Sequence, residues 1–216
     1  MRDKLQYGKN KKDNLSMFRD RIAVMTVMLS FIFTPNVAFS RVGEVEERVT
    51  LTAQAQGREE RQKEAVRLYD QAFQLYRQGK YQAALELFQK ALVIVKQIDD
   101  QIGKRIIFMS IGNVYERQKE YQKALNYFQL ALAISKQIDS KNTQGVLLNN
   151  IGDVNFNLRE YQKALYYYQQ ALVIAQTNGE KAGEGIIIKN IGEVYERQRK
   201  YQKALDYFQK ALAIAQ

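Results

Sequence analysis

A five-residue motif recurs along this chain at a constant spacing of 40 residues. Tyr-Gln-Lys-Ala-Leu begins at Tyr121, Tyr161 and Tyr201, and the variant Tyr-Gln-Ala-Ala-Leu begins at Tyr81. The similarity extends beyond the motif, because 17 of 22 positions are identical between residues 111–132 and 191–212. Self-similarity at a fixed period of this length is typical of a solenoid, in which successive units stack on one another.

Each unit contains two apolar stripes with helical spacing. In residues 101–140 the first stripe includes Ile107, Ile111 and Val114, and a second stripe begins at Tyr121 after a short polar break. Two such stripes predict a helical hairpin, and three or more stacked hairpins are needed to bury both stripes. We therefore expect an all-α fold with eight helices in four units, at about 61–100, 101–140, 141–180 and 181–216.

The small and aromatic residues of these units follow a regular pattern. The first helix of each unit carries a small residue, at Gly112, Gly152 and Gly192, and the second carries Tyr, Ala, aromatic and Ala, as at Tyr121, Ala124, Phe128 and Ala131. This pattern resembles that of the tetratricopeptide repeat family. The small residues let helix backbones approach closely, and the aromatic rings fill the space between hairpins. The resemblance covers roughly 65–216 and implies a right-handed superhelical solenoid of antiparallel helical hairpins.

Two features depart from the usual family pattern. The usual period is about 34 residues, so the extra residues should lengthen the helices or the turns. This longer form looks like the repeats of kinesin light chains and of spindle-orientation adaptors. Asn155 also stands where the pattern has an aromatic residue, which predicts looser packing in the third unit.

The amino-acid composition lacks two of the commonest catalytic and metal-binding residue types. The chain has no Cys and no His, so it offers no thiolate ligand, no imidazole base and no Ser-His-Asp or Cys-His arrangement. We therefore expect no catalytic residue, no metal site and no cofactor. The net charge is +10, but the basic residues are spread along the repeats, which favours solvated helix faces over a nucleic-acid footprint.

The N-terminal 40 residues have the order of a secretory signal: a basic stretch, an apolar stretch at residues 22–33, then Pro35 and small residues before Arg41. Twelve apolar residues are too few to span a bilayer, which needs about 20. A signal cleaved before Arg41 is the leading interpretation, and an uncleaved membrane anchor is the alternative. The chain is thus expected to be exported or anchored, with the cytoplasm less favoured. Residues 41–60 are polar and read as a linker or a poorly ordered lead-in helix.

The resemblance also suggests a binding surface, since first helices line the concave face in that family. First-helix residues that the core does not need are then candidates for a peptide-binding groove. In related peptide-binding repeats, Asn side chains at such positions hold an extended peptide backbone, because an amide both donates and accepts hydrogen bonds. The candidates are Met109, Asn113, Glu116, Arg117, Asn149, Asn150, Asp153, Phe156, Asn157, Lys189, Asn190, Glu193, Glu196 and Arg197, with Tyr69, Phe73 and Arg77 continuing the groove.

The function favoured by these features is a non-enzymatic protein-interaction scaffold that binds a peptide or protein segment on its concave face. One alternative is the N-terminal interaction region of a larger exported protein, because this layout resembles bacterial proteins that end in a caspase-like (CHAT) protease domain. Another is an intracellular regulator that senses a peptide. The membrane would be a partner only through an uncleaved N-terminal segment.

The last helix repeats the apolar pattern of the interior units, with Leu205, Phe208 and Leu212. Terminal repeats normally carry a polar outer face, and this helix has none. We therefore expect an exposed apolar strip, with either continuation of the natural chain or self-association through this helix. Continuation is the favoured alternative, and residues 61–216 alone should self-associate.

Overall fold

The computed structural model of the protein describes residues 42–214, which form helices and no strands. The predicted all-α solenoid is confirmed. The predicted signal or anchor at residues 1–40 lies outside the described residues. The helices are α2 (Val42–Arg77), α3 (Tyr81–Gln97), α4 (Gln101–Arg117), α5 (Tyr121–Gln137), α6 (Lys141–Asn157), α7 (Tyr161–Thr177), α8 (Lys181–Arg197) and α9 (Tyr201–Ile214).

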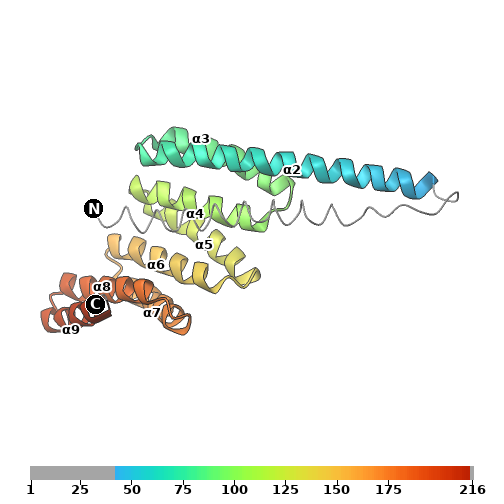
Figure 1. The fold of residues 1–216 in the computed structure, drawn as a ribbon. Helices are drawn as coiled ribbons and strands as arrows, with labels where there is room; N and C mark the ends of the chain where they lie inside the picture. Colours follow the sequence, from blue (N-terminus) through green and yellow to red (C-terminus); the bar gives the residue numbers. More distant parts are fainter. Residues whose placement is uncertain (1–41, 215–216) are drawn as a thin grey trace.

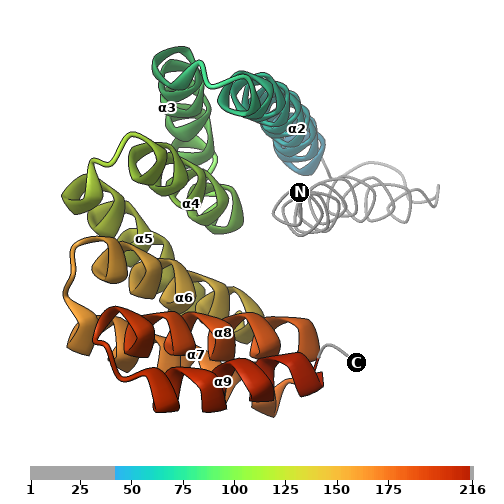
Figure 2. The same cartoon turned by 90° about the vertical axis from the view of Figure 1, so that its left-hand side faces the viewer.

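The helices pair into four antiparallel hairpins, which stack in the order of the sequence (Figure 1). Each hairpin contacts the next through its second helix, so α3 packs on α4, α5 on α6, and α7 on α8. The stack is curved. Figure 2 shows α2, α4 and α6 on the inner side of the curve and α3 and α5 on the outer side.

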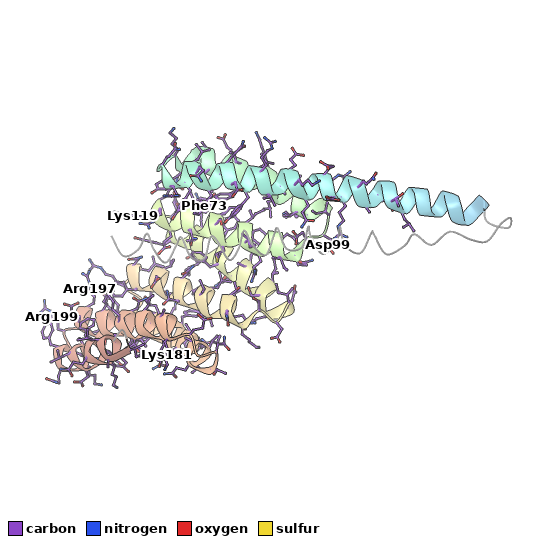
Figure 3. All side chains as sticks on the ribbon, viewed as in Figure 1. Phe73, Asp99, Lys119, Lys181, Arg197 and Arg199 are labelled. Atoms are coloured by element: carbon purple, nitrogen blue, oxygen red, sulfur yellow. The ribbon has the colours of Figure 1, made fainter. Side chains whose placement is uncertain are left out.

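The 40-residue period consists of two 17-residue helices and two three-residue connections. The extra length relative to the usual repeat thus lies in the helices. In the connection after α4, Lys119 has a φ of 62° and Glu120 N–H donates to the Tyr115 carbonyl at 2.8 Å. This bond satisfies a carbonyl that the helix end would otherwise leave open. Figure 3 shows Lys119 and Arg199 at one end of the helices and Asp99 at the other.

Helix α2 is longer than the others, at 36 residues. It runs without interruption through residues 42–60, where the sequence indicated a linker or a lead-in helix, into the first repeat. Within residues 42–214, no helix combines the length and the apolar character needed to cross a membrane.

The core depends on close contacts between first-helix glycines and second-helix rings. A Cβ atom on Gly152 would lie 2.5 Å from the Tyr168 ring, and one on Gly112 would lie 2.6 Å from the Phe128 ring. Those distances leave no room for a side chain. The asparagine that replaces an aromatic residue, Asn155, is only 2% exposed, and its Nδ2 donates to the Ile151 carbonyl at 2.7 Å. Its polar group is therefore buried with a partner.

Candidate protein-binding surface

The fourteen candidate residues lie on three first helices, α4, α6 and α8, and together they are called the first-helix face. None of them is fully buried. The exposed members are Arg117, Asn157, Lys189, Glu196 and Arg197; the half-buried members are Met109, Asn113, Glu116, Asn149, Asn150, Asp153, Phe156, Asn190 and Glu193.

The proposed continuation of this face onto α2 is wrong for two of three residues. Tyr69 is 8% exposed and Phe73 is 4% exposed, and both belong to the apolar core. The Tyr69 ring packs 5.5 Å from the Phe88 ring, and its hydroxyl lies 3.3 Å from Ser110 Oγ, which donates to it. Only Arg77 is exposed there. Aromatic rings at these two positions fill the core between α2 and α3, and apolar residues of α4 belong to the same cluster.

Four polar side chains meet at the centre of the first-helix face, around Asp153. Asp153 Oδ1 accepts hydrogen bonds from the Tyr168 hydroxyl at 2.6 Å and from Asn190 Nδ2 at 3.1 Å. Its Oδ2 accepts from Asn149 Nδ2 at 3.0 Å, and Asn190 Nδ2 also donates to Asn149 Oδ1 at 3.0 Å. Since Asn190 belongs to α8 and the other three to α6 and α7, this network joins the third and fourth hairpins.

The pKa of the Asp153 carboxyl lies well above its ordinary value. Burial raises its pKa to about 7, and the hydrogen bond from Tyr168 opposes that rise. The carboxylates of Glu116 and Glu193 raise this pKa further, whereas the ammonium of Lys189 lowers it. Three acidic side chains from three successive hairpins therefore interact here, and Asp153 changes its charge near neutral pH.

The two acidic neighbours of Asp153, Glu116 and Glu193, each interact with a basic residue. Burial raises the pKa of Glu116, and Arg117 beside it lowers that pKa. Glu193 forms an ion pair with Lys189 one helical turn earlier. The surface therefore mixes both signs of charge, and it lacks a single dominant basic cluster.

Asn150 and Asn190 are 40 residues apart among the candidates, but they are not equivalent in the structure. Asn190 directs its amide nitrogen at Asn149 and Asp153, so that donor is already engaged. An incoming peptide would have to break these bonds to use it. The same network cannot form around Asn150, because the positions 40 residues before Asn149 and Asp153 carry Met109 and Asn113.

Two arginines of this face contact aromatic residues of the preceding hairpin. The guanidinium of Arg197 lies 5.7 Å from the centre of the Phe156 ring, which is a cation–π distance. Two units earlier, Arg117 Nε donates to the Tyr76 hydroxyl at 3.4 Å. Both arginines therefore contribute to the contact between successive first helices.

Neither of two cavities in the described part of the chain, of about 700 and about 490 Å³, is lined by residues of the first-helix face. The larger is lined by residues of α2 and the α3–α4 connection, and the smaller by residues of α3, α4 and α5. Within residues 42–214, no three His, Cys, Asp or Glu side chains come together to hold a metal ion. The chemistry offered by this face is hydrogen bonding, charge pairing and aromatic contact.

Sequence reasoning missed Tyr168, the residue that anchors the network. The other repeats have Phe88, Phe128 and Phe208 at this position, so a single hydroxyl distinguishes the third hairpin. The first-helix position that faces it carries Asp153, where the neighbouring units have Asn113 and Glu193. An aligned comparison of the repeats would have found this pairing of an extra hydroxyl with an acceptor.

A curved array of helical hairpins with a polar inner face defines a repeat-type interaction protein. The family model described as tetratricopeptide repeat matches residues 68–137 and 143–216, more than half of the chain. The chain belongs to the tetratricopeptide repeat family. Among curated proteins no sequence match is found.

Several solved structures have the same fold. BtubC (BKLC) from P. vanneervenii is 20% identical, with a TM-score of 0.62 over 70% of this chain and 63% of that one. The apo form of RapI is 21% identical, with a TM-score of 0.65 over 70% and 56%. A Rap protein complexed with competence and sporulation factor is 22% identical, with a TM-score of 0.62 over 70% and 43%. The chain thus matches less than two thirds of each of these proteins.

Proposed function

We propose that this protein is an interaction scaffold that binds a peptide or a protein segment along the first-helix face. The observation that carries the proposal is the set of polar and charged side chains contributed by three successive first helices to one open surface. Such a surface offers donors and acceptors to an extended main chain over several units. A likeness in fold to a Rap protein complexed with competence and sporulation factor supports a molecular partner of this general kind.

The mixed charge of the surface favours a protein partner over a nucleic acid. Arg117, Lys189 and Arg197 are accompanied by Glu116, Glu193 and Glu196. A nucleic-acid surface would neutralise phosphates with an excess of basic residues, and its affinity would fall steeply with salt. Binding to this face should instead depend only weakly on ionic strength.

Capture of binding partners by the full-length chain would test this function. The wild-type protein is compared with the double variant Asn157→Ala, Glu196→Ala, which alters exposed residues of the first-helix face. The matched control is Gln122→Ala, Gln162→Ala, which alters exposed residues of the second helices. A partner retained by the wild type and the control but lost by the first variant supports the proposal. A partner retained equally by all three proteins contradicts it.

We also propose that the protein is exported or anchored, on the basis of the order of residues in its first 40 positions. The mature N-terminus is then Arg41 if the signal is cleaved. N-terminal sequencing of protein isolated from its natural host measures this directly. An intact N-terminus in a soluble cytosolic fraction would support an intracellular regulator instead.

A further inference from the structure

Lysine and arginine side chains gather at one edge of the array, around the connections within the four hairpins. Each connection is taken with the last two residues of the first helix and the first three residues of the second. These ranges are 76–83, 116–123, 156–163 and 196–203, and together they are called the basic edge. They contain eleven Lys or Arg residues, all exposed, and four Asp or Glu residues.

The opposite edge of the array is balanced in charge. The equivalent ranges around the connections between hairpins, 96–103, 136–143 and 176–183, contain four basic and four acidic residues. Figure 3 shows Lys119 and Arg199 at the basic edge and Asp99 at the opposite one. Basic residues that are spread along the sequence therefore come together in the structure, because the 40-residue period places equivalent turns on the same side.

Helix stability does not account for many of these basic residues. Arginines in the last turn of α2, α4 and α8 suit the helix dipole. However, Lys123, Lys163 and Lys203 lie in the first turn of a second helix, where the dipole favours acidic residues, and those turns contain none. Lys119 and Arg199 have φ angles of 62° and 60°, which glycine adopts with less strain. The positive charge of this edge therefore points to a partner.

The charge is not uniform along the basic edge. The connections of the first and fourth hairpins carry Lys80 and Lys200, whereas those of the second and third carry Glu120 and Glu160 at the same position. Glu120 forms an ion pair with Lys123 at 3.5 Å, and Glu160 forms an equivalent pair at 2.8 Å. The strongest positive charge therefore lies at the two end hairpins, with carboxylates between them.

This pattern fits a protein segment better than a uniform polyanion. A nucleic acid carries a charge on every nucleotide, so its phosphates would face Glu120 and Glu160. Among the aromatic rings of the basic edge only Tyr201 is exposed, so successive bases would lack a stacking platform. A protein segment can instead place acidic residues at both ends and neutral ones opposite the two glutamates.

The direction of α2 argues against a membrane as the partner of this edge. The N-terminal end of α2 projects on the side away from the basic edge (Figure 1). Its 36 residues span roughly 54 Å at about 1.5 Å per residue. The end of α2 to which the proposed anchor is joined is therefore remote from these charges, and an anionic bilayer would also face the two glutamates.

We propose that the basic edge binds an acidic segment of a partner protein, with its acidic residues grouped opposite the first and fourth hairpins. The connections within the hairpins follow the curve of the stack, so an extended segment can pass from one to the next (Figure 2). This contact goes beyond the proposed function. The edge borders the first-helix face, but Lys80, Lys119, Arg159, Arg199 and Lys200 lie outside that face.

Binding of a designed acidic peptide to the full-length chain tests this inference. The probe is a fluorescent peptide with two blocks of Glu joined by a Gly-Ser linker, and Gln replaces Glu in its control. Fluorescence anisotropy should show at least tenfold tighter binding of the acidic peptide. Unlike binding at the first-helix face, its affinity should fall steeply as salt rises.

A charge-reversal variant locates the site of binding. Arg199→Glu, Lys200→Glu should weaken binding of the acidic peptide at least tenfold. The matched control is Lys90→Glu, Lys136→Glu, which changes exposed lysines outside the basic edge and has the same net charge. The control should bind within about twofold of the wild type, and circular dichroism should show that all three proteins fold alike. Equal weakening by both variants, or no binding of the acidic peptide at low salt, would overturn the proposal.

DNA and anionic vesicles test the other partners. Single-stranded DNA, duplex DNA and vesicles that contain phosphatidylglycerol should bind the wild type more weakly than the acidic peptide does. Glu120→Gln, Glu160→Gln should strengthen their binding at least threefold and change peptide binding less, because it removes the carboxylates that a uniform polyanion would face. Tighter binding of DNA or vesicles than of the peptide by the wild type would overturn the proposal.

Discussion

The Tyr168 hydroxyl donates a 2.6 Å hydrogen bond to Oδ1 of Asp153. The bond joins the second helix of the third hairpin to the exposed side of its first helix. Asn190 from the next hairpin donates to the same oxygen at 3.1 Å. One carboxyl therefore connects three helices, and its protonation state affects both the packing of the array and the charge of the candidate binding surface.

Replacing Asp153 by Asn should change how stability depends on pH. The folded-state pKa of Asp153 is about 7, whereas an unfolded aspartate titrates near 3.9. The folded state thus holds a proton that the unfolded state has released between about pH 4 and pH 7. The contribution of Asp153 to the free energy of unfolding is highest below this window, falls as pH rises through it and is constant above it. Asp153→Asn should remove this fall and stabilise the protein at pH 8 by roughly 1–3 kcal/mol.

Chemical denaturation of both proteins at pH 5 and at pH 8 measures this effect. The difference in unfolding free energy between variant and wild type isolates Asp153, because the other titrating groups are shared. The variant should gain stability relative to the wild type as pH rises. A difference that is independent of pH would mean that Asp153 is ionised throughout this range in the folded protein.

Tyr168→Phe should destabilise the protein without creating a cavity, because the ring is retained. At pH 8 the ionised Asp153 loses a donor, which typically costs about 1.5–3 kcal/mol for a charged acceptor. The pKa of Asp153 should rise further, since the hydrogen bond from Tyr168 lowers it. Stability of this variant at pH 8, alone and combined with Asp153→Asn, measures the coupling between the two residues. Additive effects of the two substitutions would argue against a direct bond.

Gly152→Leu should destabilise the array by about 2–4 kcal/mol through overpacking. A Cβ at this position would lie 2.5 Å from Tyr168 Cε1, so the helices would have to separate. Glu196→Ala, an exposed change on the first-helix face, should alter stability by less than about 0.5 kcal/mol. Thermal unfolding ranks the two variants, and the reverse order would show that the glycine does not lie at the helix crossing.

A second glycine provides a matched comparison within a first helix. A Cβ on Gly185 would lie 3.5 Å from the nearest side-chain atom of Ile214, which is an ordinary contact. Gly185→Ala should therefore stabilise α8 by up to about 1 kcal/mol through helix propensity. Gly152→Ala should instead destabilise the protein, and equal effects would contradict the crowding at Gly152.

Residues with a positive φ in the connections should respond in opposite ways to substitution at two equivalent turns. Gly79 has a φ of 76° and Arg159 has a φ of 62°. A side chain in this region costs about 1–2 kcal/mol. Gly79→Ala should lower the free energy of unfolding by about 1 kcal/mol, whereas Arg159→Gly should raise it by up to about 1 kcal/mol. Urea denaturation measures both changes, and stabilisation by Gly79→Ala would contradict the turn geometry.

Much of the fold could be predicted because it depends on short-range patterns that repeat. The 40-residue period and the two apolar stripes predicted eight helices in four hairpins, and Gly112, Gly152 and Gly192 marked the helix crossings. The positions of the candidate residues on three first helices also followed from the period. These features can be predicted from the sequence because each hairpin has nearly the same neighbours as the next.

The sequence by itself determined which residues share a helix and which helix pairs with which. Only the tertiary structure decided which first-helix side chains are accessible. Tyr69 and Phe73 lie in the core, and Asn190 turns its amide towards Asn149 and Asp153 instead of solvent. The period could not show this, because burial, hydrogen bonding and the pKa of Asp153 depend on side chains that adjacent hairpins bring together from positions about 40 residues apart.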